Sequence, residues 1–291
     1  MTTAELSPEL TTIRAVGVLW TLDQIITGLA AAVAVIALIQ WFRRGRDPLA
    51  GAPQRPNRLR EDSVLFAVCV YLLAAAVLGG LARLVADAPD GIIARLITGN
   101  GAQIAGIVAC LILAEKFFDG GVRAFVAGPE LDRRRLLASW ILISLVGIGL
   151  CPVVAEATVR TMRYFAPDQP ITPHPTIEAL RAGPLSWSIR VALWISAAIV
   201  APIAEEVFFR GFLQTFLVRV TQARWTAIVL TSVAFGVVHV SQLHTVIALT
   251  LLGVLMGYAY ERRGSILLPI AIHAAFNLKT LVWDAWGAYA A

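Results

Sequence analysis

Eight long apolar stretches, separated by short charged segments, constrain the fold of this chain more than any other feature. A helix needs about 20 apolar residues to cross roughly 30 Å of hydrocarbon, and each stretch is close to or above that length. Hydrophobic residues make up 58% of the 291 residues, more than a soluble core of this size would bury. We therefore expect an all-α polytopic membrane helical bundle with about eight transmembrane helices. The expected spans are residues 16–42, 63–85, 92–117, 136–158, 187–218, 225–240, 245–260 and 266–283.

Arginine clusters follow the first, third, fifth and seventh stretches, and the intervening connections are acidic or mixed, as in the segment with Asp87 and Asp90. Short basic loops remain cytoplasmic, which predicts that both termini are external. The net charge of +5 is explained by this topology, so we expect membrane lipids as partners and no nucleic acid. The abundance of Ala, Arg and Val is typical of a GC-rich genome and favours a multi-pass protein of the bacterial cell membrane.

Three segments organise the chain: residues 1–186 with four spans and an external loop, residues 187–283 with the candidate chemistry, and a short tail at 284–291. The proline-rich loop at 162–184 contains His174, and we expect an irregular external cap without chemistry there. The pair Gly253 and Gly257, four residues apart, predicts close approach of a neighbouring helix. Several residues are interpreted without function, as packing cysteines or as charges near span ends: Cys69, Cys110, Cys151, Asp23, Glu115, Lys116, Glu156 and Arg160.

Three charges lie in the middle of the fifth stretch, where an ionisable group costs at least a few kcal/mol and often marks function. Glu206 and Arg210 are four residues apart and can form an ion pair on a helix. Glu205 points elsewhere, about 100° round the helix, without such a partner. Burial without a fixed cation suits a carboxylate for general-base chemistry. Pro202 should leave the carbonyl of Ala198 without its helical donor and kink the span.

Two of the four histidines, His239 and His273, are expected well inside spans, with Asn277 one turn beyond His273. At about 1.5 Å per residue, Glu205 and His239 fall at nearly the same depth, roughly 20 Å from the cytoplasmic turn between them. Asn277 approaches that level from the last span. We therefore expect Glu205, His239, His273 and Asn277 to converge, with Glu206 and Arg210 in support.

Peptide hydrolysis requires a base for water, an imidazole and neutral oxyanion donors, and this set contains all three. Glu205 would be the base, His239 would assist it, and His273 with Asn277 would stabilise the oxyanion. Alternatively, Glu205, His239 and His273 could bind Zn²⁺, whose open position would hold the water. Asn is a poor zinc ligand, which favours a metal-free site, but the residue types leave both possibilities open. No His-Glu-x-x-His or Gly-x-Ser-x-Gly motif is present.

Three ordered motifs closely resemble the CPBP family of CAAX proteases and bacteriocin-processing enzymes, also called the Abi family. They are Glu205-Glu206-x-x-x-Arg210, Phe235-x-x-x-His239 and His273-x-x-x-Asn277. The resemblance covers about residues 187–283. It implies an eight-helix intramembrane endopeptidase in which Glu205 and His239 activate water and His273 and Asn277 stabilise the oxyanion, with the zinc question open.

The alternative function is a catalytically idle membrane scaffold, an immunity protein or a transporter-like protein that uses its buried charges for assembly or coupling. A proton-coupled transporter is expected to show related halves, and this chain shows no such repeat. For the peptidase, the expected partner is a protein or peptide substrate that reaches the site from the membrane. Neither the substrate nor the oligomeric state follows from the sequence.

Overall fold

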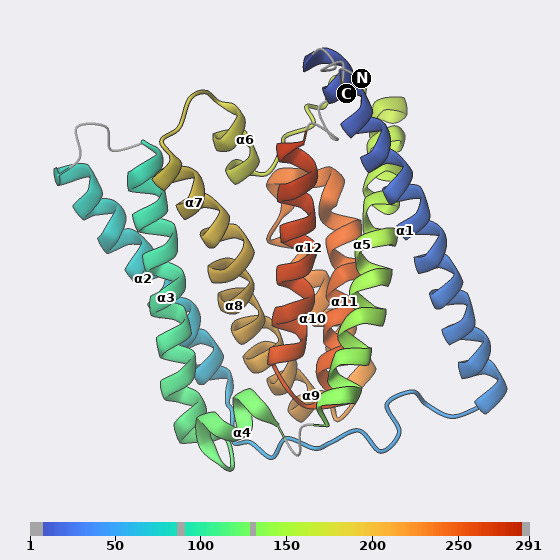
Figure 1. Ribbon diagram of the computed structural model, residues 1–291. Helices are drawn as coiled ribbons and strands as arrows, with labels where there is room; N and C mark the ends of the chain where they lie inside the picture. The colour runs from blue at the N-terminus through green and yellow to red at the C-terminus, as the bar shows by residue number, and fades with distance from the viewer. Residues whose placement is uncertain (1–7, 86–90, 129–131, 287–291) are drawn as a thin grey trace.

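The computed structural model describes residues 8–85, 91–128 and 132–286, which form a helical bundle without a β-strand (Figure 1). The expected all-α fold is therefore confirmed. The first half contains α1 (Pro8–Arg44), α2 (Glu61–Val85), α3 (Ile92–Phe117), α4 (Gly121–Ala127), α5 (Arg133–Phe165) and α6 (Pro175–Arg181). The second half contains α7 (Trp187–Ile195), η1 (Ser196–Val200), α8 (Ala201–Glu206), η2 (Val207–Gln214), α9 (Thr215–Thr221), α10 (Arg224–Val237), η3 (Val240–Thr245), α11 (Val246–Arg263) and α12 (Leu267–Ala285). The expected acidic connection with Asp87 and Asp90, and the tail after Trp286, lie outside the described residues.

Several of these helices are long and apolar enough to cross a membrane, which makes the chain an integral membrane protein. Among the described residues the six that qualify are Gly17–Arg44, Glu61–Arg83, Ile92–Phe117, Arg133–Phe165, Trp187–Thr221 and Val240–Arg263. The other two expected spans are also helices of the bundle. However, α10 has only 14 residues and is about 21 Å long, which is short for a membrane span. The 19 residues of α12 include several polar side chains among the apolar ones. These two helices carry or adjoin the candidate site.

The helices are arranged in two outer pairs around a central group (Figure 1). One pair is α2 with α3 and the other is α1 with α5, while α7 to α9, α10, α11 and α12 lie between them. The elements from α7 to α9 form one continuous helix that contacts α3 on one side and α12 on the other. A core cluster that includes Phe209, Phe235, Leu252 and Ile272 joins η2, α10, α11 and α12. The candidate site residues thus lie on or next to the elements that this cluster joins.

The glycine pair of α11 produces the close approach that its spacing predicts. A Cβ added at Gly253 would lie 2.9 Å from Cβ of Ser232, and one added at Gly257 would lie 3.1 Å from Ile228. Both neighbours belong to α10, which packs along α11. The prediction of a glycine-mediated helix contact is confirmed.

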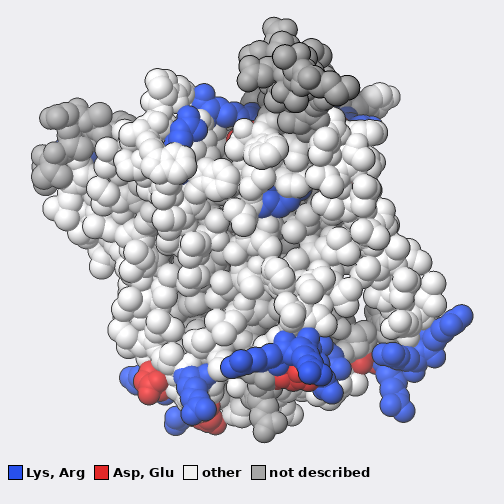
Figure 2. All heavy atoms as spheres, viewed as in Figure 1, with Lys and Arg blue, Asp and Glu red and all other residues white. Residues whose placement is uncertain are grey.

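Basic side chains gather along one edge of the bundle, at the ends of α1, α9 and α11 (Figure 2). A broad band with few charged side chains lies above that edge on the face shown. We refer to the opposite edge, where α1 begins and α12 ends, as the outer side. The arrangement agrees with the expected alternation of basic loops, and the orientation in a membrane stays a prediction.

The loop expected to be an irregular cap is partly helical, which corrects that expectation. Residues 175–181 form α6, because His174 accepts a backbone hydrogen bond at its N-terminus and Pro175 occupies the first helical position. At the other end, Arg181 Nε donates to Asp284 Oδ1 at 2.9 Å. The side chain of Asp284 is only 5% exposed, so this ion pair attaches the cap to the last turn of α12.

Candidate active site

Glu206 and Arg210 form the buried ion pair that their spacing predicts. Arg210 Nη1 lies 2.6 Å from Glu206 Oε1, and both side chains are fully buried. Arg210 also donates to the carbonyl oxygen of Gly253 at 3.3 Å, and its guanidinium lies 4.6 Å from the centre of the Phe235 ring. Buried charges are tolerated where they are paired and hydrogen-bonded. Here both groups are paired, while Glu206 Oε2 and Arg210 Nε have no hydrogen-bond partner among the described residues. The pair therefore ties the centre of the long helix to α11.

A second contact of Glu206 was not expected from the sequence. His273 Nδ1 lies 2.9 Å from Glu206 Oε1, and His273 is almost completely buried. Since a carboxylate oxygen can only accept, Nδ1 carries the hydrogen of this bond. The remaining ring nitrogen, Nε2, lies 3.9 Å from Glu205 Oε2. Glu206 is thus more than a clamped partner of Arg210, because it also orients the imidazole that faces Glu205.

Glu205 has the environment expected of an available base. Its side chain is 26% exposed, and Oε2 is buried without a hydrogen-bond partner among the described residues. Among the described residues, no arginine or lysine forms an ion pair with Glu205, whereas Arg210 neutralises Glu206. The nearest imidazole in the described structure is that of His273. The two adjacent carboxylates therefore differ in surroundings, as their positions on the helix predict.

His239 is placed differently from the expectation. It follows the end of α10 with a non-helical backbone (φ −98°, ψ 19°) and begins η3, so it lies at a helix terminus instead of inside a span. Its Nδ1 lies 2.8 Å from the carbonyl oxygen of Phe235. Within the described residues no hydrogen bond or ion pair joins it to Glu205 or His273. Because α10 has 14 residues, it carries His239 about 21 Å from the basic turn, which is the depth expected for Glu205. Direct pairing of Glu205 with His239 stays a prediction.

Phe235 links the two imidazoles and was missed as a site residue. Its fully buried ring lies 5.1 Å from the ring of His239 and 5.6 Å, edge to face, from that of His273. The spacing Phe235-x-x-x-His239 was visible in the sequence, and one helical turn between an aromatic residue and a histidine was the available signal. Both imidazoles therefore contact the same apolar ring.

Asn277 donates a hydrogen bond to a backbone carbonyl that has no donor within the long helix from α7 to α9. Ala201 donates its N–H to Ser196, five residues back, so η1 is a π-helical turn. In that pattern the donor for Ala197 would be residue 202, which is proline and has no N–H. Asn277 Nδ2 instead donates to the Ala197 oxygen at 2.8 Å. The freed carbonyl is therefore that of Ala197 and not Ala198, because the π turn shifts the hydrogen-bond register by one residue.

Two further polar contacts connect the site to the first half of the chain. Ser196 and Asn100 of α3 are joined by a hydrogen bond of 2.6 Å, one residue before the carbonyl that Asn277 binds. On the basic side, the buried carboxylate of Glu261 accepts from Gln214 at 2.9 Å and pairs with Arg55 from the loop after α1. Neither contact could be inferred from spacing, because the partners are far apart in the sequence.

The side chains do not fit a three-ligand zinc site. Among the described residues, no group of three His, Cys, Asp or Glu side chains is placed so that it could hold a metal ion. Glu205 Oε2 and His273 Nε2 lie 3.9 Å apart, whereas His239 has no hydrogen bond or ion pair with either residue in the described part of the chain. The expected zinc set of Glu205, His239 and His273 is not assembled, and no step below depends on a metal.

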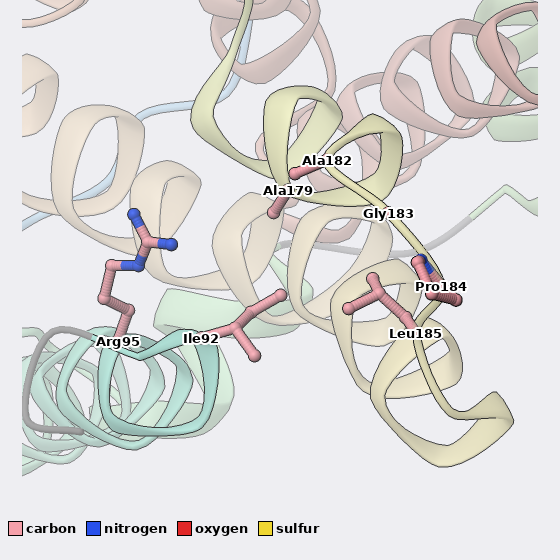
Figure 3. A pocket seen from close by; sticks show the side chains of 7 residues that line it. All are labelled: Ile92, Arg95, Ala179, Ala182, Gly183, Pro184 and Leu185. Carbon is pink, nitrogen blue, oxygen red and sulfur yellow. The ribbon is translucent and has the colours of Figure 1, made fainter.

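A pocket of about 230 Å³ lies on the outer side, away from this charge cluster (Figure 3). It separates the start of α3 from the cap, and Arg95 is its one charged lining residue. The residues that line it are Ile92, Arg95, Ala179, Ala182, Gly183, Pro184 and Leu185. None of them belongs to the candidate site. The pocket shows that α6 is attached on the side of α12 and leaves space on the side of α3.

Comparison with known families covers the part of the chain that contains the site. Residues 186–279 match the family model described as type II CAAX prenyl endopeptidase Rce1-like. This match confirms the resemblance to CAAX proteases, and it includes every charged and histidine residue of the expected site. No curated protein and no solved structure matches the chain. Asn100, His174 and Arg55 lie outside the matched segment.

Proposed function

Residues 186–279 are an Rce1-like domain, and from this premise we propose that the protein is an intramembrane endopeptidase in which Glu205 activates water. The observation that carries the proposal is the buried group of Glu206, Arg210 and His273 beside the unpaired Glu205. A purely structural ion pair needs only Glu206 and Arg210. The imidazole held between two carboxylates, one paired and one free, adds the elements of acid–base chemistry.

Charge balance supports a protonated His273 in the reactive state. The carboxylates of Glu205 and Glu206 and the guanidinium of Arg210 together carry a net charge of −1. One further proton on this cluster makes it neutral. Neutrality is strongly favoured in a low-dielectric interior. The Nδ1 hydrogen is already engaged by Glu206, and the exchangeable proton therefore belongs on Nε2, next to Glu205. This state keeps Glu205 ionised as a base and turns His273 into a cationic donor.

The reaction then follows from the available groups. Glu205 removes a proton from water, whose oxygen attacks the carbonyl carbon of the scissile peptide bond. His273 Nε2–H and the second amide hydrogen of Asn277 stabilise the oxyanion, because the first one is bound to Ala197. The bare Nε2 of His239 accepts the other hydrogen of the water and orients it. Glu205 finally gives its proton to the leaving nitrogen, the C–N bond breaks, and a carboxylic acid and an amine are released.

We assign the substrate only by class, as a membrane-associated or exported protein or peptide. In this proposal the substrate reaches the site from the membrane. The test compares the membrane proteomes of three strains: a deletion, the deletion restored with wild type, and the deletion restored with Glu205→Gln. Identical precursors accumulating in the deletion and the Glu205→Gln strain support the proposal. A Glu205→Gln strain that matches wild type contradicts it and favours an idle scaffold.

A further inference from the structure

Asn100 lies within the membrane-spanning segment of α3 and binds a hydroxyl group of the long helix. Ser196 Oγ donates to Asn100 Oδ1 at 2.6 Å. Hydroxyl side chains in helices can donate to the carbonyl four residues back, as Ser232, Thr250 and Thr280 do in this bundle. Ser196 donates to a second helix instead. The bond therefore joins α3 to η1, and the helices that carry these elements lie side by side in the bundle (Figure 1).

The turn that Ser196 begins is also the turn that has lost a backbone hydrogen bond. The carbonyl of the next residue, Ala197, has no donor in its own helix, because Pro202 has no N–H. Asn277 of α12 donates to this carbonyl at 2.8 Å. Two adjacent residues of η1 are thus bound from two sides, Ser196 by α3 and Ala197 by α12. Because one backbone bond is missing here, the position of the turn depends on these two side-chain bonds.

The position of this turn matters for the proposed chemistry through the amide of Asn277. One amide hydrogen binds the Ala197 oxygen, and the other is the proposed oxyanion donor. Both hydrogens belong to one planar group, so the place of the Ala197 carbonyl sets the direction of the second hydrogen. Oxyanion donors act when they are preorganised at about 2.7–3.1 Å from the developing charge. A displaced turn would therefore weaken the donor without any contact to the substrate.

We propose that Asn100 is a positioning residue of the peptidase, which acts through Ser196 and Ala197 to hold the Asn277 amide in place for the oxyanion. This inference rests on the proposed function and assigns a role in the site to a residue outside the matched residues 186–279. The loss of one neutral hydrogen bond corresponds to roughly a three- to tenfold change. Since the oxyanion exists only in the transition state, the loss should lower kcat and leave KM nearly unchanged.

Three substitutions and one control test the role of this hydrogen bond. Ser196→Ala removes the donor, Asn100→Ala removes the acceptor, and Ser196→Thr keeps a hydroxyl group. The matched control is Thr98→Val, since Thr98 lies on the same helix but packs toward α2. Each protein is reconstituted in vesicles with the precursor that accumulates in the Glu205→Gln strain, and kcat and KM are measured. Ser196→Ala is also combined with Asn277→Ala and measured in single turnovers.

The proposal predicts that Ser196→Ala and Asn100→Ala each lower kcat about three- to tenfold, with KM within about twofold. Ser196→Thr and Thr98→Val should resemble wild type. In the Asn277→Ala protein, the further change Ser196→Ala should alter the rate by less than about twofold, because the donor that it positions is already absent. A structural role alone would lower the rate by the same factor in both backgrounds, and that result would overturn the proposal.

Wild-type kcat in Ser196→Ala would also overturn the proposal. This variant removes a single oxygen atom, so it remains a valid test if Asn100→Ala does not fold. Full activity of Glu205→Gln would instead refute the proposed function itself. An inactive Glu205→Gln protein together with a fully active Ser196→Ala protein would refute only the role of Asn100, so the two failures are distinguishable.

Discussion

The carboxylate of Glu206 holds the imidazole of His273 at 2.9 Å while the same oxygen accepts from Arg210 at 2.6 Å. One carboxylate oxygen thus joins the structural ion pair to the imidazole that faces Glu205. This arrangement separates the roles of two adjacent glutamates without any difference in residue type. It also makes the behaviour of Glu206 variants informative about both stability and chemistry.

We expect Glu206→Gln to lower both stability and activity. The amide still accepts a hydrogen bond, but Arg210 becomes an uncompensated buried charge, which costs about 3–5 kcal/mol of unfolding free energy. In the double variant Glu206→Gln/Arg210→Met, most of that stability should return, because the buried guanidinium is removed together with its partner. Activity should stay at least tenfold below wild type, since the carboxylate that orients the His273 imidazole is no longer present. Unfolding in mixed micelles and kcat measure the two effects, and a double variant with wild-type kcat would show that Glu206 is only structural.

The bond from Asn277 to Ala197 predicts an energetic coupling with Pro202. Asn277→Ala leaves a buried carbonyl without a donor and should cost about 1–3 kcal/mol. Pro202→Ala supplies the missing N–H, so the double variant should be more stable than the sum of the single changes predicts, by at least about 0.5 kcal/mol. Its kcat should remain low, because the oxyanion donor is still absent. Additive stabilities would contradict the proposed backbone role, and recovery of kcat would contradict the catalytic one.

Close packing at Gly253 should make this position intolerant of a single methyl group. Alanine there would place Cβ within 2.9 Å of Ser232 and would push away the carbonyl that binds Arg210. We expect Gly253→Ala to lose about 1–3 kcal/mol of stability. Gly80→Ala is the matched control, because an added Cβ meets no atom within 4 Å there. Thermal unfolding in detergent compares the two, and equal midpoints would argue against the close α10–α11 contact.

The outer cap should weaken in acid because His174 caps α6 only when Nδ1 is unprotonated. Burial and, second, the charge of His239 lower its pKa from 6.5 to about 4, so the folded protein prefers the neutral form. The sign follows: the stabilisation is present above the unfolded pKa and is lost as pH falls from about 6.5 to 4. Amide hydrogen exchange of α6, corrected for intrinsic rates, should show falling protection across this window.

His174→Asn provides the control for this pH dependence, since asparagine caps without titrating. The variant should retain protection across the same window, although Glu178 and the Asp284 contact of Arg181 remain in both proteins. A wild-type cap with constant protection between pH 6.5 and 4 would contradict capping by the unprotonated Nδ1.

Local spacing predicted the contacts that occur within one helix or between close-packed neighbours. The four-residue interval of Glu206 and Arg210 indicated their ion pair, and Gly253 with Gly257 indicated the α10–α11 contact. The alternation of apolar and basic segments predicted the helical membrane fold. Each of these follows from helix geometry and needs no knowledge of the tertiary structure.

Contacts that depend on helix rotation could not be predicted in the same way. Equal depth placed Glu205 beside His239, yet the described contact of Glu205 is with His273, because depth says nothing about which face a side chain occupies. The π turn moved the unsatisfied carbonyl from Ala198 to Ala197, which no α-helical count anticipates. His174 was expected in an irregular loop, whereas it caps α6, which begins at the next residue.

The most direct test of the central claim is the cleavage rate of purified Glu205→Gln in vesicles, measured on the precursor that accumulates in the corresponding strain. Glu156→Gln is the matched control, because Glu156 is exposed and pairs with Arg160 on the surface of α5. We predict wild-type cleavage by Glu156→Gln and a rate for Glu205→Gln that is about a hundred- to ten-thousandfold lower, with an unchanged unfolding midpoint. Cleavage by a folded Glu205→Gln protein at the wild-type rate would contradict the assignment of Glu205 as the base.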